Sequence, residues 1–306
     1  MQGRQGRPGR WGLNALRCLP LCLLAVVLWR EKPWAVQLSA SAPWAVAASV
    51  LLNFIVFLPL KAARWRVALE DPPPFRQALA ATLEGLLANI AIGFGSGDLV
   101  RAARLQRDRL AVDYACTWAE RGAEVLALAI LIFAIALLTK LGPLALIVSG
   151  LIAAGYLALL GAGRLLVPRL AGWPRVQRAL SAGLQASTPR RVTIMVVLSL
   201  LGWCCEIVML VLFQRAFGLE PSFRTGALTL VGLNAAIVIP TLPGNFGTFE
   251  AGVATALILC GAPRDVALSY AVTYHLSHVL PVAAVGAALF VYRSRRYRTT
   301  PEQSSI

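Results

Sequence analysis

Stretches of about 20 mostly apolar residues, long enough for a helix to cross a bilayer, recur along the whole chain. Hydrophobic residues make up 58% of the sequence and charged residues 14%, so one water-soluble core could not bury the apolar side chains. We predict an all-α polytopic membrane protein with seven or eight membrane segments, one or two of them re-entrant or broken. The expected segments are residues 11–29, 44–60, 77–96, 117–139, 142–163, 192–214, 225–242 with 246–260, and 266–292.

The amino terminus, MQGRQGRPGR followed by an apolar run, has the layout of a secretory signal, and ASA at 40–42 could serve as a cleavage site. The distance to that site is long and several spans follow, so we expect the first helix to be retained. We divide the chain into a basic cytoplasmic amino terminus (1–10), a transmembrane domain (11–292) and a basic cytoplasmic tail (293–306).

The net charge of +15 would suggest nucleic acid as a partner of a soluble protein. Zinc-finger spacing, a basic zipper and an aromatic RNA-binding signature are all missing, so we expect no nucleic acid. Basic residues that flank membrane helices instead mark the cytoplasmic side and contact anionic lipid. The basic clusters lie at residues 1–10, 61–76, 98–113, 164–191 and 293–298.

These clusters predict the path of residues 77–97. If this segment crossed the membrane completely, the last three clusters would lie outside, against the positive-inside rule. If it enters and returns, all five clusters and both termini are cytoplasmic. We therefore predict a re-entrant hairpin bent at IGFGSGD, which supplies Gly93, Gly95 and Gly97.

A second break lies in PGNFGTFE, residues 243–250, where Pro243, Gly244, Asn245 and Gly247 interrupt an apolar stretch. The segment could re-enter, span twice or simply kink, and charge parity does not distinguish these paths. A helix restarting here would direct free N–H groups into the break, where Glu250 could cap them or pair with an arginine. Two such breaks, one in each half, suggest an inverted repeat around a central substrate site.

Acidic residues within the apolar segments should face the interior and find partners, because an unpaired carboxylate facing lipid is costly. Glu120 and Glu124, one turn apart, can share an arginine from another segment. Such an ion pair could fix helix packing or line a path for a lipid headgroup. The five acids are Glu84, Glu120, Glu124, Glu206 and Glu250.

The motif GSGDLVRAARLQR places Asp98 where it could cap a helix and spaces Arg101, Arg104 and Arg107 along one helical face. That face could be solvated, or it could form a basic mouth that gathers an anionic headgroup. Residues 164–187 mix arginines with leucines and suit an interfacial segment.

His275 and His278 lie three residues apart without a third ligand nearby, which favours packing or hydrogen bonding over a metal site. The six cysteines lie in or beside apolar segments and form no Cys-x-x-Cys pair. Nucleotide loops, nucleophile elbows and metalloprotease motifs are missing. We expect no metal, no cofactor and no catalytic residues.

Several motifs together resemble one family, the transmembrane region of lysylphosphatidylglycerol synthases, also called the flippase-like or UPF0104 family. The resemblance extends over about residues 13–292. The motifs are RWR at 64–66, GDLVR at 97–101, AERGAEVLAL at 119–128, IPTLPGNFGTFE at 239–250 and YAVTYHLSHVLPVAAVG at 270–286.

The resemblance implies an integral membrane protein that flips phospholipids or assists polyprenyl-linked or hopanoid-type lipid pathways. The family's aminoacyl-transfer domain would follow the membrane region, but only fourteen residues follow Tyr292, so we expect no lysyl-lipid synthesis by this chain alone. The positions that match the family's motifs are Arg64, Gly97, Asp98, Arg101, Glu120, Arg121, Pro243, Gly244, Gly247 and Glu250.

We therefore expect a flippase-like protein of the bacterial inner (cytoplasmic) membrane. In this hypothesis Arg101 and neighbouring arginines attract the headgroup, the two breaks line a polar cavity, and Glu120 and Glu250 balance its charge. The partners would be membrane lipids, either anionic phospholipid or polyprenyl-linked lipid. The alternatives are a membrane-embedded lipid or glycosyl transferase and a scaffold for a separate lipid-modifying enzyme.

Overall fold

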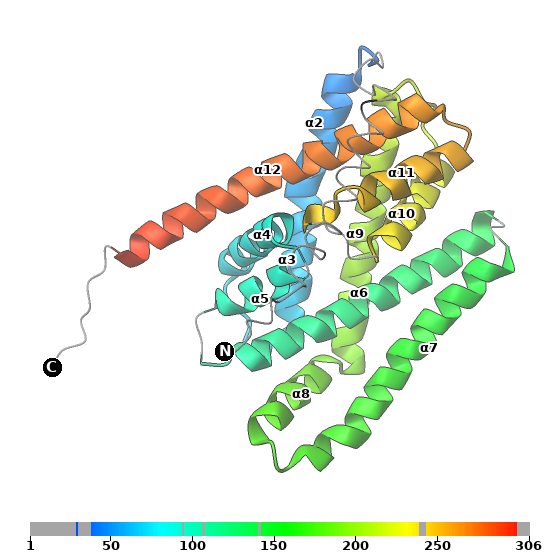
Figure 1. The fold of residues 1–306 in the computed structure, drawn as a ribbon. Coiled ribbons are helices and arrows are strands. Elements are labelled where there is room, and N and C mark those ends of the chain that lie inside the picture. Colours follow the sequence, from blue (N-terminus) through cyan, green and yellow to red (C-terminus); the bar gives the residue numbers. More distant parts are fainter. Residues whose placement is uncertain are drawn as a thin grey trace, which may run out of the picture.

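The computed structural model describes residues 29, 38–93, 95–105, 108–139, 142–238 and 243–298, and all regular structure in these ranges is helical (Figure 1). The predicted first membrane segment, apart from Trp29, and the basic amino terminus lie outside the described residues. The helices are α2 (Ala42–Leu52), η2 (Asn53–Phe57), α3 (Leu58–Ala68), α4 (Phe75–Ala91), α5 (Ser96–Ala103), α6 (Leu110–Thr139), α7 (Pro143–Leu166), η3 (Val167–Leu170), α8 (Pro174–Ala186), α9 (Pro189–Ala216), α10 (Phe223–Ile237), η4 (Pro243–Asn245), α11 (Thr248–Leu259) and α12 (Arg264–Arg298).

Five helical stretches in the described ranges are long and apolar enough to cross a membrane. Shorter apolar helices accompany them, so the predicted fold class, a polytopic all-α membrane protein, is confirmed. The last helix, α12, continues to Arg298, past the expected end of the membrane domain at residue 292. The five stretches are Ala42–Ala68, Leu110–Thr139, Pro143–Leu170, Pro189–Ala216 and Arg264–Arg295.

The first of these stretches joins α2 and α3 through η2, one turn of π-helix. Such a turn widens the helix locally and is frequent at functional sites. The α2–α3 stretch runs antiparallel to α9. At one end the N–H of Ser39 donates to the carbonyl of Ala216 at 3.0 Å, and at the other Nη1 of Arg64 donates to Oγ of Ser199 at 3.0 Å.

Residues 75–103 form the predicted hairpin, because α5 turns back along α4. The N–H of Gly97 donates to Oδ1 of Asn89 at 2.8 Å, and Oγ of Ser96 donates to the carbonyl of Ala88 at 3.0 Å. One turn further on, a Cβ on Gly85 would lie 2.7 Å from the carbonyl oxygen of Gly97 and 3.4 Å from Cβ of Arg101. Only glycine at position 85 allows the two helices this close approach.

Residues 223–259 form a second hairpin, in which α11 returns along α10. A Cβ on Gly232 would lie 2.9 Å from Cβ of Ala256, and one on Gly252 would lie 2.7 Å from Cβ of Ala236. With 15 and 12 residues, α10 and α11 are about 22 and 18 Å long, short of the roughly 30 Å of a bilayer core. The return of α11 along α10 excludes a simple kink, and the length of the two helices favours re-entry over two full spans.

The two hairpins start at opposite ends of the bundle and meet at their tips. The first follows the carboxyl end of α3, and the second follows the carboxyl end of the antiparallel α9. A Cβ on Gly93 would lie 3.0 Å from Cα of Pro243. Each half of the chain thus has a span, a hairpin and a span, in opposite directions, which is the element order of an inverted repeat.

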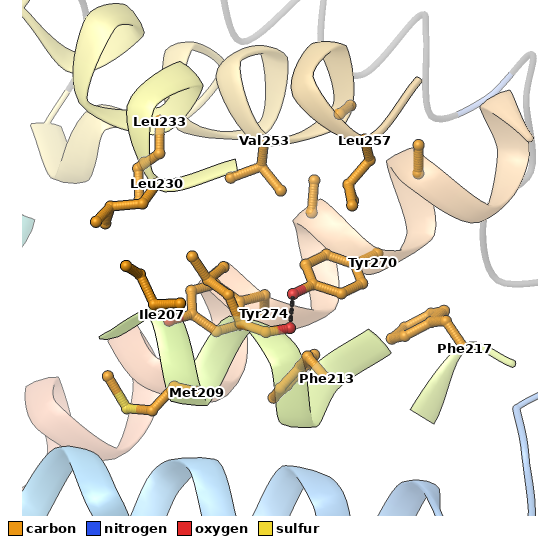
Figure 2. Packing of buried hydrophobic residues seen from close by; sticks show 14 of the residues in the cluster. Ile207, Met209, Phe213, Phe217, Leu230, Leu233, Val253, Leu257, Tyr270 and Tyr274 are labelled. Atoms are coloured by element: carbon orange, nitrogen blue, oxygen red, sulfur yellow. Dashed lines mark hydrogen bonds between the residues drawn. The ribbon is translucent and has the colours of Figure 1, made fainter. Parts of the chain in front are cut away.

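An aromatic core holds the second half together. In Figure 2 the side chains of Phe213 from α9, Leu230 from α10, Leu257 from α11 and Tyr274 from α12 face one another. The rings of Phe213 and Tyr274 meet edge to face, with their centroids 4.9 Å apart. This core fixes the second hairpin against the long helices that flank it.

Candidate functional site

A cavity of about 520 Å³ lies where the hairpin tips meet, between α3, α4, α9 and α12. Its wall is partly apolar, with Phe57, Leu86, Met209 and Val282 among the lining residues. Polar and ionisable side chains line the remainder, although the α2–α3 stretch, α9 and α12 around the cavity are long enough to cross a membrane. These polar residues are Asn53, Lys61, Asn89, Asp98, Arg121, Glu206, Asn234, Asn245, Tyr274, His275 and His278.

A buried ion cluster borders the cavity on the side of the first hairpin. At its centre the side chain of Glu120 on α6 is fully buried. Its Oε1 lies 2.8 Å from Nε of Arg64 on α3, and its Oε2 lies 2.5 Å from Nη2 of Arg101 on α5. The guanidinium of Arg101 also stacks over the Trp65 ring, 4.8 Å from its centroid. Glu120 thus ties three helices together.

The same cluster contains the shared arginine that the spacing of Glu120 and Glu124 predicted. Nη2 of Arg64 lies 2.9 Å from Oε1 of Glu124, so one guanidinium contacts both carboxylates, and this prediction is confirmed. Nζ of Lys61 lies 3.3 Å from the same oxygen of Glu124. The other carboxylate oxygen of Glu124 accepts from Nη1 of Arg121 at 2.6 Å.

Asp98 joins the cluster instead of capping its helix. The cap position of α5 is Gly95, and Asp98 lies in the first turn, so the predicted capping role is wrong. Its carboxylate accepts from Nε and Nη2 of Arg121 at 3.0 and 2.8 Å, and lies 3.3 Å from Arg101. This bidentate pair holds α5 against α6.

The cluster contains four cations (Lys61, Arg64, Arg101, Arg121) and three carboxylates (Asp98, Glu120, Glu124), a difference of one positive charge. Lys61, Asp98 and Arg121 line the cavity, whereas Arg64 and Arg101 lie behind that layer. The Arg121 side chain is 28% exposed and the Arg101 side chain 3%. Arg121 is therefore the arginine of this cluster that faces the cavity.

Glu250 lies on the other hairpin, apart from this cluster. Its Oε2 accepts the N–H of Gly247 at 2.7 Å, so it caps its own helix, one of the two predicted options. Its partner is His275 and not an arginine, with 2.8 Å between Oε1 and Nδ1. The His275 ring stacks on Phe249 with centroids 4.0 Å apart, and it lines the cavity. Glu250 thus orients a cavity-facing imidazole.

Glu206 is a further acid of the cavity wall. It extends from α9, and Lys61 is its electrostatic partner, although no hydrogen bond or ion pair joins these two side chains. Glu84, by contrast, lies 2.5 Å from Nε of Arg104 and 3.5 Å from Nη1 of Arg293, away from the cavity. The arginines at 101 and 104 therefore both point into the protein.

The structure also includes residues that sequence reasoning did not select. Lys61 was counted only as a loop charge, although it lies in the α2–α3 span and lines the cavity. For His275 and His278 the sequence favours packing or hydrogen bonding. Both make hydrogen bonds, His278 to Oγ of Ser49 at 3.0 Å, and both also line the cavity, which the sequence does not indicate. Within the described residues, no group of three or more His, Cys, Asp or Glu is placed to hold a metal ion.

Comparison with known proteins supports the resemblance seen in the motifs. The family model described as the lysylphosphatidylglycerol synthase TM region matches residues 16–286. A UPF0104 membrane protein from Methanothermobacter thermautotrophicus is 33% identical over 91 residues, which cover 30% of this chain and 27% of that relative. No solved structure matches the chain. Since the family model covers most of the sequence, the chain belongs to the lysylphosphatidylglycerol synthase TM region family.

Proposed function

We propose that this protein moves a membrane lipid between leaflets, with the polar headgroup passing through the cavity at the hairpin tips. The observation that carries the proposal is the position of this cavity. It is lined by ionisable side chains, yet it lies among helices long enough to span a bilayer. Polar groups inside a membrane are costly and usually mark a path for a substrate or an ion.

Two cations in the cavity wall favour a phosphate-bearing headgroup. Lys61 and Arg121 face the cavity from α3 and α6, together with two lining carboxylates, Asp98 and Glu206. The buried cluster that holds Lys61 and Arg121 has one more cation than it has carboxylates. A phosphate could replace part of the contact between Arg121 and its carboxylates, since arginine binds phosphate and carboxylate with the same fork geometry. In this scheme Arg64 and Arg101 position the cluster, and Arg121 contacts the lipid.

The opposed hairpins supply an element that could move. Half-helices that enter from opposite ends and meet near the middle of the bundle are typical of transporters that alternate access between two sides. The contact between Gly93 and Pro243 would separate or shift when the cavity opens toward one leaflet. We place the protein in the cytoplasmic membrane with both termini inside, which is supported by the five basic clusters of the sequence.

Reconstitution into liposomes tests the proposal. Fluorescent phospholipids with phosphate headgroups, placed in both leaflets, should become accessible to an external quencher faster with the protein than in protein-free liposomes. Glu206→Gln should speed this exchange without unfolding the protein, because it removes a carboxylate from the cavity wall beside Lys61 and so lowers the repulsion of an anionic headgroup. Glu70→Gln is the matched control, since Glu70 is exposed and pairs with Arg109 away from the cavity. Exchange by the wild type at the protein-free rate would contradict the proposal.

A further inference from the structure

A second hollow lies outside the central bundle, between α6, α7 and α8. It measures about 970 Å³ and shares no lining residue with the central cavity. In Figure 1, α6 and α7 run side by side as an arm, and α8 lies beside their lower ends. A Cβ on Gly183 of α8 would lie 3.2 Å from the carbonyl oxygen of Ala115 of α6, so these helices meet closely at the base of the groove.

The groove between α6, α7 and α8 is walled by apolar side chains that remain open to the surroundings. Trp118 from α6 is 61% exposed and Leu159 from α7 is 74% exposed, and both line the groove. Within α7 the buried residues are Ser149 and Tyr156. In a membrane, apolar surface of this kind is covered by acyl chains or by another protein.

The charged lining of this groove is confined to one end. Arg169 in η3 and Arg175 in the first turn of α8 line it, both are exposed, and neither has a hydrogen bond or ion pair in the described part of the chain. The first turn of α8 has no acidic residue, and its cap residue Trp173 makes no side-chain cap. The positive end of the helix dipole therefore adds to the two guanidinium charges.

We propose that the groove binds one anionic phospholipid, with its phosphate at Arg169 and Arg175 and its acyl chains along α6, α7 and α8. The charge pattern of the groove favours this occupant. A phospholipid has an anionic phosphate at one end and acyl chains beyond it. The groove has two arginines at one end and apolar side chains beyond them. The bound lipid covers Trp118 and fills the space between the arm and α8. The site is separate from the path proposed for translocation.

Quenching of Trp118 reports on this site directly. The full-length protein in detergent is titrated with phosphatidylglycerol whose acyl chains carry bromine, which quenches tryptophan in contact with the chains. The difference between the wild type and Trp118→Phe isolates the signal from the groove. We expect saturable quenching of Trp118 by this lipid and much weaker quenching by phosphatidylcholine with the same brominated chains.

The arginines are tested by the double variant Arg169→Gln/Arg175→Gln. It should need about 30-fold more phosphatidylglycerol for half-maximal quenching, since each basic residue near an anionic lipid surface contributes about a factor of five. Arg178→Gln is the matched control: Arg178 is exposed on the same helix but does not line the groove, so its titration should follow the wild type.

Five results would overturn this inference. Three concern the titrations: equal quenching by the zwitterionic lipid, an unchanged titration of the double variant, and an equal loss in Arg178→Gln. The fourth is displacement of the lipid by glycerol phosphate at the same concentration, which would indicate a site for the headgroup alone. The fifth is a dimer in which Trp118 is not quenched, which would mean that a second copy of the chain fills the groove. Lipid exchange in liposomes is measured separately, so a failure here is distinguishable from a failure of the proposed function.

Discussion

Gly93 and Pro243, at the tips of two hairpins from opposite halves of the chain, lie in contact. A Cβ on Gly93 would lie 3.0 Å from Cα of Pro243. The φ angle of Gly93 is +77°, a conformation that residues with a Cβ adopt only with strain. Position 93 therefore requires glycine for two separate reasons, its backbone conformation and its neighbour.

These two reasons can be separated by substitution. Gly95 also has a positive φ, +72°, but a Cβ there would meet nothing within 4 Å. We expect Gly95→Ala to lower the free energy of unfolding by about 1 kcal/mol through backbone strain alone. Gly93→Ala should lose roughly 1–3 kcal/mol more because it also overpacks the tip contact. Equal losses in denaturant unfolding of the two variants in detergent would show that the tips do not touch.

Close packing within each hairpin gives a second prediction. Gly85→Ala would bring a Cβ to 2.7 Å from the carbonyl of Gly97, and Gly252→Ala to 2.6 Å from that of Gly232. Each substitution should lower the free energy of unfolding by about 1–3 kcal/mol, which thermal unfolding reports as a lower midpoint temperature. Gly150→Ala, in α7 with open space around it, should be neutral or stabilising by up to about 1 kcal/mol. A similar loss at all three positions would contradict the hairpin geometry.

Substitution of two glutamates, one inside the ion cluster and one outside it, should differ greatly in its cost to the free energy of unfolding. Glu120→Gln leaves the buried guanidinium groups of Arg64 and Arg101 short of a counter-charge, and should cost about 3–5 kcal/mol of unfolding free energy. Glu70→Gln removes the partner of Arg109 at an exposed site and should cost less than about 1 kcal/mol. Chemical unfolding measures both, and similar values would mean that the cluster around Glu120 is hydrated.

The contact between Glu250 and His275 can be measured with a double-mutant cycle. Both side chains are buried, and the Oε1 to Nδ1 distance is 2.8 Å. We expect Glu250→Gln and His275→Phe to be non-additive, with a coupling of about 1.5–3 kcal/mol for a hydrogen bond to a charged group. Additive effects of the two substitutions would indicate that Glu250 acts only as a helix cap.

Much of the fold follows from the sequence because charge and hydropathy act locally along the chain. The arginines on both sides of residues 77–97 predicted the first hairpin, and the structure shows α5 returning along α4. The second hairpin had no such marker, since charge parity is the same for a re-entrant loop and for two spans. Its path is determined by the close approach of Gly232 and Gly252, which depends on three-dimensional packing.

The site was predictable only in part, for a related reason. The spacing of Glu120 and Glu124 predicts a shared arginine, but it does not say that Arg64 and Arg101 lie behind the cavity while Arg121 faces it. Lys61 lies beside arginines in the sequence and resembles a loop cation, until α3 places it opposite Glu124. Which side chains of a helix face the cavity depends on how the helices pack against one another.

Blocking the cavity tests the central claim, that a lipid headgroup passes between the hairpin tips, more directly than any change of charge. Val279 of α12 lines the cavity, whereas Val285 of the same helix does not and is 39% exposed. In liposomes that contain fluorescent phospholipid, Val279→Trp should reduce exchange between leaflets to the rate of protein-free liposomes, while Val285→Trp should match the wild type. Full exchange by a folded Val279→Trp protein would contradict the account.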